Sequence, residues 1–143
     1  MSYGQLNNLN LKVLVRLSRT TAEIHKRSSN IFSKGGLTTS QFAVLEALYH
    51  KGDLTINEII ESILSTSGNM TVVINNLEKD GMVERHINPN DKRSSLISIT
   101  EKGKIKIEEI FPIHLKDLEA NLQALSDEEK QILIDLLKKI GTK

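Results

Sequence analysis

The chain of 143 residues is 38% hydrophobic and 26% charged, with a formal net charge of +1, which fits one ordinary globular domain. No apolar run approaches the roughly 20 residues that a membrane span requires, and residues 1–12 lack the features of a secretory signal, so we expect a cytoplasmic protein. The chain contains no cysteine, which excludes disulfides, thiolate metal sites and sensing by cysteine oxidation.

Helix start and stop signals divide the chain into segments. A Ser or Thr followed three residues later by Glu or Gln forms a capping box, which satisfies backbone N–H groups at the start of a helix. Glycine after an apolar periodic run supplies the left-handed conformation in which many helices end. The capping boxes are Thr38/Gln41, Thr55/Glu58 and Ser126/Glu129, and the terminating glycines are Gly35–Gly36, Gly52, Gly81 and Gly141.

Three amphipathic helices are predicted in the first half of the chain. Their expected bounds are about Leu6 to Lys34, Thr39 to Lys51, and Ile56 to Leu64. In the first helix, apolar residues recur at intervals of seven, at Leu17, Ile24 and Ile31. That interval is typical of a helix that packs along a seam.

A fourth helix is expected to follow a corner of only a few residues. Ser65, Thr66 or Ser67 can cap its start, and the helix should end at Asp80 before Gly81. Residues 83–88 and 95–99 alternate in part between apolar and polar side chains, and the turn-rich residues 89–94 join them. The sequence therefore predicts a β-hairpin with a charged tip.

The last part of the chain is again helical in pattern. One helix is predicted from Thr100 to about Leu125, with a kink at Pro112, which removes one backbone hydrogen bond. A sixth helix is predicted from Asp127 to Ile140, with Leu133, Leu136 and Leu137 on one face.

The order helix, tight corner, helix and hairpin is that of a winged helix-turn-helix, whose second corner helix enters the DNA major groove. The predicted fold is therefore mainly α with a small β-hairpin wing and six helices, in one domain of residues 1–143. We expect DNA binding in residues 37–100 and dimerisation through the flanking helices, residues 5–36 and 101–141.

The fourth helix has one apolar and one polar face. Met70, Val73, Ile74 and Leu77 form the inward stripe at helical spacing. The opposite face is small and polar, so it can approach base edges, and Asn can pair with adenine through two hydrogen bonds. The candidate DNA contacts in and before this helix are Thr66, Ser67, Gly68, Asn69, Thr71, Val72, Asn75, Asn76 and Lys79.

Local charge tolerates DNA although residues 51–100 carry five Lys or Arg against seven Asp or Glu. No carboxylate lies between Ser65 and Leu77, and the positive end of the helix dipole favours phosphate. At the hairpin tip, Lys92 and Arg93 are placed to enter the flanking minor groove, with Asp91 expected to hold Arg93 by a two-oxygen pair. Taken singly, the wing tip is explained at least as well by a solvated turn, and the Asn and Thr face of the helix by ordinary surface polarity. These explanations do not account for both features occurring together in this order.

The strings ILSTSGNMTVVINNLEKDGMVER and NPNDKRSSLISITEKG resemble the DNA-binding signature of the MarR family of transcription regulators. The resemblance covers residues 38–105 closely, and the flanking helices agree in number and placement with the six-helix plan of the family. The wording TSGNMTVVI is also similar to a branch that includes regulators responding to quinones and related phenols.

This resemblance implies a cytoplasmic homodimer that binds double-stranded DNA, with Asp91 positioning Arg93 in the minor groove. The terminal helices have apolar faces that otherwise lack a partner, which also favours dimerisation. A two-fold dimer predicts a pseudo-palindromic operator with half-sites roughly 10 bp apart. Family members commonly release DNA on binding a small aromatic or phenolic ligand. The candidate pocket residues are Arg16, Tyr49, His50 and Phe111.

Other functions have little support in the sequence. His25, His50, His86 and His114 lack close ligand spacing, so no metal is expected. No cofactor motif, nucleophile context or carboxylate pair indicates an enzyme. The main alternative is a winged-helix module for protein–protein contact, which gives no reason for Arg93 at the wing tip. A second alternative, a ligand-binding or enzymatic helical dimer, requires a convergent polar site that the sequence does not show.

Overall fold

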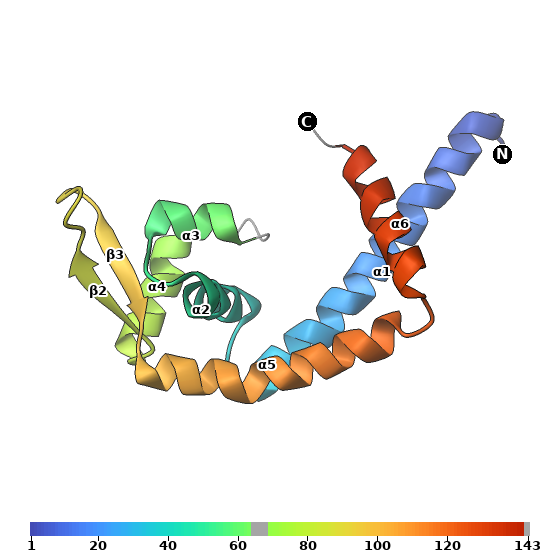
Figure 1. Cartoon of the computed structure of the whole chain (residues 1–143). Helices are drawn as coiled ribbons and strands as arrows, with labels where there is room; N and C mark the ends of the chain where they lie inside the picture. Colours follow the sequence, from blue (N-terminus) through green and yellow to red (C-terminus); the bar gives the residue numbers. More distant parts are fainter. Residues whose placement is uncertain (64–68, 142–143) are drawn as a thin grey trace.

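The computed structural model describes residues 1–63 and 69–141, which form six α-helices and three β-strands (Figure 1). The helices are α1 (Gln5–Lys34), α2 (Thr39–Lys51), α3 (Ile56–Ser62), α4 (Met70–Lys79), α5 (Glu101–Leu122) and α6 (Asp127–Lys139). The strands are β1 (Leu54–Thr55), β2 (Val83–Ile87) and β3 (Ser95–Ile99). The predicted fold, mainly α with a β-hairpin wing, is confirmed.

The three strands form one antiparallel sheet in the order β1-β3-β2. The hairpin of β2 and β3 was predicted, but β1 was not. Only two residues belong to β1, too few for an alternating pattern to be visible, and the strand exists because Leu54 pairs with Ile97 and Thr55 with Leu96. Long-range pairing therefore adds an element that local sequence does not indicate.

The three capping boxes form as predicted, and each starts a helix. The Thr38 hydroxyl, for example, accepts the backbone N–H of Gln41 at 3.1 Å, and the Gln41 side chain accepts the N–H of Thr38 at 2.9 Å. Gly81 has a φ of +76°, which lets the chain reverse from α4 into β2. These local signals fix where the helices of the winged domain begin and end.

Several predicted bounds are too long by one to three residues. The strand predicted to Asn88 ends at Ile87, because Asn88 already belongs to the wing turn. The helix predicted over 100–125 runs from Glu101 to Leu122 with Thr100 as its cap, and Pro112 lies within it. The last helix ends at Lys139 rather than Ile140, and α3 ends at Ser62, whereas Leu64 lies outside the described residues.

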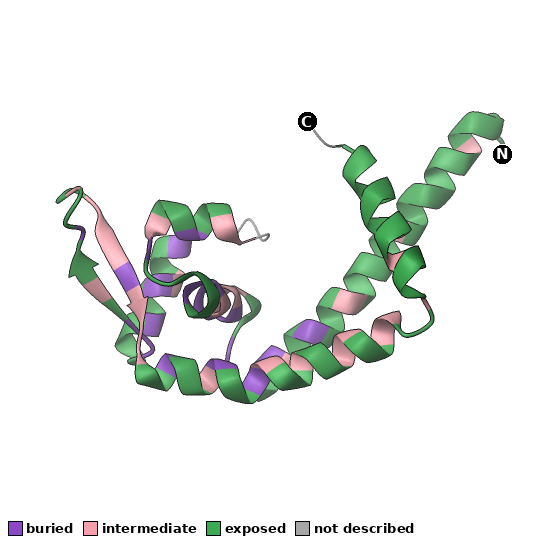
Figure 2. Cartoon of the chain, viewed as in Figure 1, coloured by how far each residue is buried: buried purple, intermediate pink, exposed green. Residues whose placement is uncertain are grey.

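The hydrophobic core lies between α2, α3, α4, the sheet and the first half of α5 (Figure 2). Apolar side chains from each of these elements are almost fully buried, which supplies most of the driving force for folding. The largest are Leu45, Leu48, Ile59, Ile74, Leu77, Ile97 and Ile107. This core holds α4 and the β2–β3 hairpin in a fixed relation.

Helices α1 and α5 extend from this core, and α6 turns back beyond the end of α5 (Figure 1). The C-terminal end of α1 packs against α2 and α5, where Ser28 and Phe32 are buried. Arg27 binds Asp117 of α5 with an Nη2–Oδ1 distance of 2.5 Å. None of the described helices combines the length and apolar character needed to cross a membrane.

Candidate nucleic-acid interface

Helix α4 begins later than the sequence predicts. Its cap is Asn69, whose side-chain oxygen accepts the backbone N–H of Val72 at 3.4 Å, and Met70 is the first helical residue. The predicted caps Ser65, Thr66 and Ser67, together with Gly68, lie outside the described residues. Because Asn69 is an N-cap, its amide oxygen is partly engaged by its own helix.

The two faces of α4 are divided as the periodicity predicts. Met70, Ile74 and Leu77 are buried in the core, and Val73 is half-buried. The outward residues Thr71, Val72, Asn75, Asn76 and Lys79 are all exposed. Val72 exposes 47% of its surface, so the helix presents one apolar side chain among amide and hydroxyl groups. Such a surface has the donors, acceptors and methyl groups that major-groove base edges bind.

The wing turn is organised by a buried asparagine that the sequence analysis did not single out. Asn88 is only 9% exposed, and its side-chain oxygen accepts the backbone N–H of Asn90 at 3.0 Å. Its amide nitrogen donates to the Ser94 hydroxyl at 3.1 Å, across the base of the turn. The sequence Asn-Pro-Asn favours a turn, so the signal was present in the sequence.

Asp91 orients Arg93 at the tip of the wing, though not through the two-oxygen pair that was predicted. A single oxygen, Oδ1, accepts both the backbone N–H of Arg93 at 3.0 Å and its Nε at 3.1 Å. The Arg93 side chain remains 92% exposed, and Lys92 beside it is exposed as well. The turn therefore fixes the direction of the guanidinium group while leaving its terminal nitrogens open to a ligand.

A contact between β2 and α4 was missed by the sequence analysis. Arg85 donates through Nε to Glu78 Oε1 at 3.1 Å and through Nη2 to Asn75 Oδ1. Arg85 pairs with buried Ile97 in the sheet, so its side chain leaves β2 on the face that covers the core. The signal in the sequence was an arginine at a strand position where the alternation predicts an apolar side chain.

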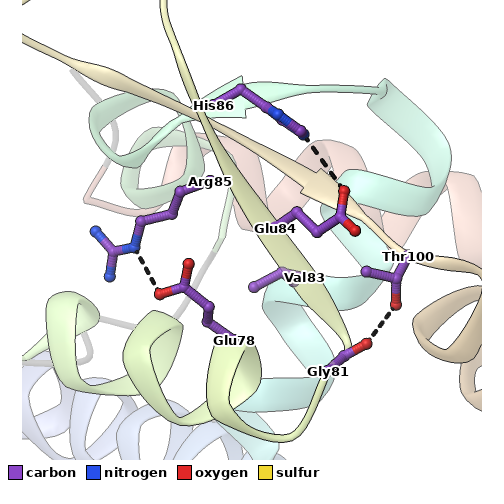
Figure 3. A pocket seen from close by; sticks show the side chains of 7 residues that line it. All are labelled: Glu78, Gly81, Val83, Glu84, Arg85, His86 and Thr100. Atoms are coloured by element: carbon purple, nitrogen blue, oxygen red, sulfur yellow. Dashed lines mark hydrogen bonds and ion pairs between the residues drawn. The ribbon is translucent and has the colours of Figure 1, made fainter.

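A cleft of about 420 Å³ lies where α4 ends and β2 begins (Figure 3). Arg85 extends toward Glu78 on α4, whereas Glu84 and His86 extend from the opposite face of β2 (Figure 3). The distance from His86 Nε2 to Glu84 Oε2 is 3.6 Å. The lining residues are Glu78, Gly81, Val83, Glu84, Arg85, His86 and Thr100. None of the four predicted ligand-pocket residues lines this cleft.

Three of those four ligand-pocket candidates come together where α2 meets α5. The ring of His50 lies 5.1 Å from that of Tyr49 and 5.1 Å from that of Phe111. The Tyr49 hydroxyl donates to Glu108 at 3.1 Å, and this hydrogen bond raises the pKa of Tyr49. Arg16 is exposed in the N-terminal half of α1, where no residue is buried.

The same aromatic group continues toward α1. Phe32 stacks on Phe42 at 3.9 Å between ring centroids, and the ring of His114 lies 5.1 Å from Phe32 and 5.7 Å from Phe42. Burial lowers the pKa of His114, while Asp117 and Glu46 act in the opposite direction. Its Nδ1 is buried without a hydrogen-bond partner among the described residues. In the sequence, His114 is only one of four scattered histidines.

Within residues 1–63 and 69–141, no three His, Asp or Glu side chains are grouped so that they can hold a metal ion. The exposed groups of α4 and of the wing tip are hydrogen-bonding side chains and a guanidinium. Such groups bind base edges and phosphates.

The chain is similar to known transcription regulators in sequence and in fold. Residues 37–95 match the model of the MarR family. The chain is 37% identical over 131 residues to the HTH-type transcriptional regulator MhqR of Bacillus subtilis, which covers 92% of this chain and 90% of that relative. It also resembles the crystal structure of a MarR-like transcription regulator from Bacillus cereus, with a TM-score of 0.77, 29% identity, and 94% and 95% of the two chains covered.

A third comparison is to a protein bound to DNA. The chain matches a cysteine-to-serine mutant of MarR from E. coli in complex with operator DNA, with a TM-score of 0.73 and 27% identity. The match covers 90% of this chain and 95% of that chain. With a relative of 37% identity along nearly its whole length, the chain belongs to the MarR family of DNA-binding transcriptional regulators.

Proposed function

We propose that this protein is a homodimeric repressor that binds a pseudo-palindromic operator through residues 37–100 and dimerises through residues 5–36 and 101–141. Half-sites are then about 10 bp apart, one turn of the duplex. On each protomer α4 enters the major groove and the wing lies along the adjacent minor groove. The DNA contacts are those predicted from the sequence, which include Thr71, Val72, Asn75, Lys92 and Arg93.

The observation that carries this proposal is the exposed guanidinium at the wing tip. Arg93 is oriented by Asp91 through Nε, yet 92% of its side chain is exposed. An arginine that is oriented and exposed suits the narrow minor groove, whose negative potential attracts guanidinium groups. The protein-contact alternative supplies no role for this arrangement.

Dimerisation is supported by the apolar surface of the terminal helices. In the single chain, no described residue of α6 is buried, and the N-terminal half of α1 is almost wholly exposed (Figure 2). A soluble monomer rarely exposes so large an apolar patch without a partner. The exposed apolar residues of these helices include Leu6, Leu9, Val13, Leu14, Leu133, Leu136 and Leu137.

A small aromatic or phenolic ligand is the proposed signal that releases DNA. The support for it is the cluster of Tyr49, His50 and Phe111 at the junction of the winged domain with α5. A ligand that separates these rings would change how α2 packs on α5. Arg16 stays a predicted pocket residue that the single chain does not bring to this cluster.

The experiment that tests the proposal is DNA binding by fluorescence anisotropy with a duplex from the protein's own upstream region and a scrambled duplex of equal length. Wild type should prefer its own region, and its affinity should fall steeply with salt because phosphate contacts release counterions. Arg93→Ala should weaken specific binding by about tenfold, in line with about 1–3 kcal/mol for one good groove contact. Lys116→Ala removes an exposed cation from α5, outside the interface, and serves as the matched control.

Equal binding of both duplexes, with no effect of Arg93→Ala beyond that of Lys116→Ala, would contradict binding to this operator. If selection from a randomised duplex library then also recovered no preferred sequence, the protein-contact module would be favoured instead.

A further inference from the structure

We propose that Arg85 is a positioning residue that fixes the side-chain amide of Asn75, so that Asn75 meets DNA as a hydrogen-bond donor only. The inference rests on the proposed function, in which α4 lies in the major groove. It concerns which base α4 accepts rather than whether the protein binds DNA.

The orientation of the Asn75 amide follows from the chemistry of its partner. A guanidinium group has only N–H donors, so the group of Asn75 that faces Arg85 must be the acceptor, Oδ1. This assignment does not depend on telling oxygen from nitrogen in the side chain, because only one choice makes a hydrogen bond. The NH2 group, on the other branch of the amide, makes no hydrogen bond to the described residues.

Arg85 is itself held in place at both ends. Its stem leaves β2 beside buried Ile97, and its Nε donates to Glu78 Oε1 at 3.1 Å (Figure 3). Glu78 and Asn75 lie one turn apart on α4, so Arg85 bridges two residues of the same helix. The Arg85 side chain is only 28% exposed, and its charge is neutralised by Glu78. The guanidinium is therefore a fixed support for the Asn75 amide.

This support changes what Asn75 can recognise. Two-bond pairing with adenine needs the amide oxygen to accept from the adenine N6 group while the NH2 donates to N7. Oδ1 has a second lone pair, but this oxygen is the branch of the amide that faces the Arg85 guanidinium, so the NH2 on the other branch is the group offered to a base. Major-groove acceptors occur on adenine, guanine and thymine, whereas cytosine presents a donor there. The position that Asn75 contacts should accept A, G or T and reject C.

The test is a base-substitution profile of the half-site, measured for the full-length protein on an operator chosen by selection from a randomised duplex library. For wild type, one symmetric position should bind A, G and T within about threefold of one another and C about tenfold more weakly. Asn75→Ala should remove the base preference at this position and at no other. Asn76→Ala alters the neighbouring exposed amide, which is itself a proposed DNA contact, so its effect should fall at another base position, and it serves as the matched control for this one.

Two variants separate positioning from a merely structural role. Arg85→Met keeps an unbranched stem but frees Oδ1. The variant should therefore prefer adenine at this position, and its affinity for duplexes with G or T there should be about fivefold weaker. Asn75→Asp keeps an acceptor for Arg85 and turns the outer group into an acceptor. It should therefore favour C at that position, because cytosine N4 donates. Asn75→Asp retains the contact to Arg85, so it gives a result even if Arg85→Met does not fold.

The outcomes are distinct. A wild-type profile that accepts adenine alone at this position, or an Asn75→Asp profile that is equally weak for all four bases, would overturn the role of Arg85. In either case selective binding that depends on Arg93 would leave the proposed function standing. Absence of any selected operator would overturn the proposed function and this inference with it.

Discussion

A Cβ atom on Gly103 would lie 2.4 Å from the backbone carbonyl oxygen of Met82 and 2.7 Å from Cγ1 of Ile99. Gly103 is in the first turn of α5, and this close approach places α5 against Met82, which lies between α4 and β2, and against Ile99 at the end of β3. In the same place, the Thr100 hydroxyl donates to the carbonyl of Gly81 at 2.6 Å. Helix α5 is therefore joined directly to the turn between α4 and β2 and to the end of β3.

Gly103→Ala should lower the free energy of unfolding by about 2 kcal/mol, because the neighbouring carbonyl is backbone and cannot move aside as a side chain can. Urea unfolding followed by circular dichroism measures this. Lys104→Ala, at the next and exposed position of the same helix, is the control and should change stability by less than about 0.5 kcal/mol. Equal stability of the two variants would show that α5 shifts easily against β2.

Asp91→Ala should weaken specific DNA binding although it removes a negative charge from the wing. Loss of the carboxylate alone would strengthen binding to phosphates, but the variant also loses both hydrogen bonds that orient Arg93. We expect a net loss of about threefold to tenfold in affinity, about 1 kcal/mol. Asn90→Ala, in the same turn, is the control. An increase in affinity would mean that long-range charge outweighs the orientation of Arg93.

Leu136→Asp should convert the proposed dimer into monomers. Leu136 is 51% exposed in the single chain, so the substitution leaves the core of the protomer intact while placing a charge in the proposed interface. Sedimentation velocity should show the mass of one chain, and operator affinity should fall by more than tenfold because one half-site alone is bound. Gln131→Glu adds the same charge on the polar side of α6 and should remain dimeric. A dimeric Leu136→Asp variant would place the interface elsewhere.

Most of the fold could be predicted because its signals are local. Capping boxes at Thr38, Thr55 and Ser126 and the apolar periodicities fix the helices without reference to the rest of the chain. The strand β1 could not be predicted, since two residues carry no period and its existence depends on pairing with β3. Asn69 was expected to contact DNA, but its capping role depends on where α4 begins, which is the least determined feature of a helix pattern.

The candidate site was predictable in composition but not in its connections. The exposed face of α4 follows from helical spacing, and the charged wing tip follows from turn chemistry. The hydrogen bonds from Arg85 to Asn75 and Glu78 join a strand to a helix across a reversal of the chain, and no rule of residue spacing predicts them. The ring cluster of Phe32, Phe42 and His114 likewise comes from three separate helices.

Stability should fall on acidification in part because of His114. Burial lowers the pKa of His114 in the folded chain, so the unfolded chain binds the proton more readily, and the free energy of unfolding decreases as pH falls below about 6.5. Above that value both states are neutral at this residue and it contributes no pH dependence. His114→Phe keeps an aromatic ring against Phe32 and Phe42 and removes the titration.

Urea unfolding at pH 7.5 and at pH 5.0 tests this reasoning. Wild type should lose more stability between the two pH values than His114→Phe does, with the two proteins differing least at pH 7.5. His25→Gln, at an exposed position on α1, is the control and should follow wild type at both pH values. If His114→Phe lost as much stability as wild type on acidification, the protonated imidazole would have to be solvated in the folded chain, and the ring cluster at the junction of α1, α2 and α5 would open readily to water.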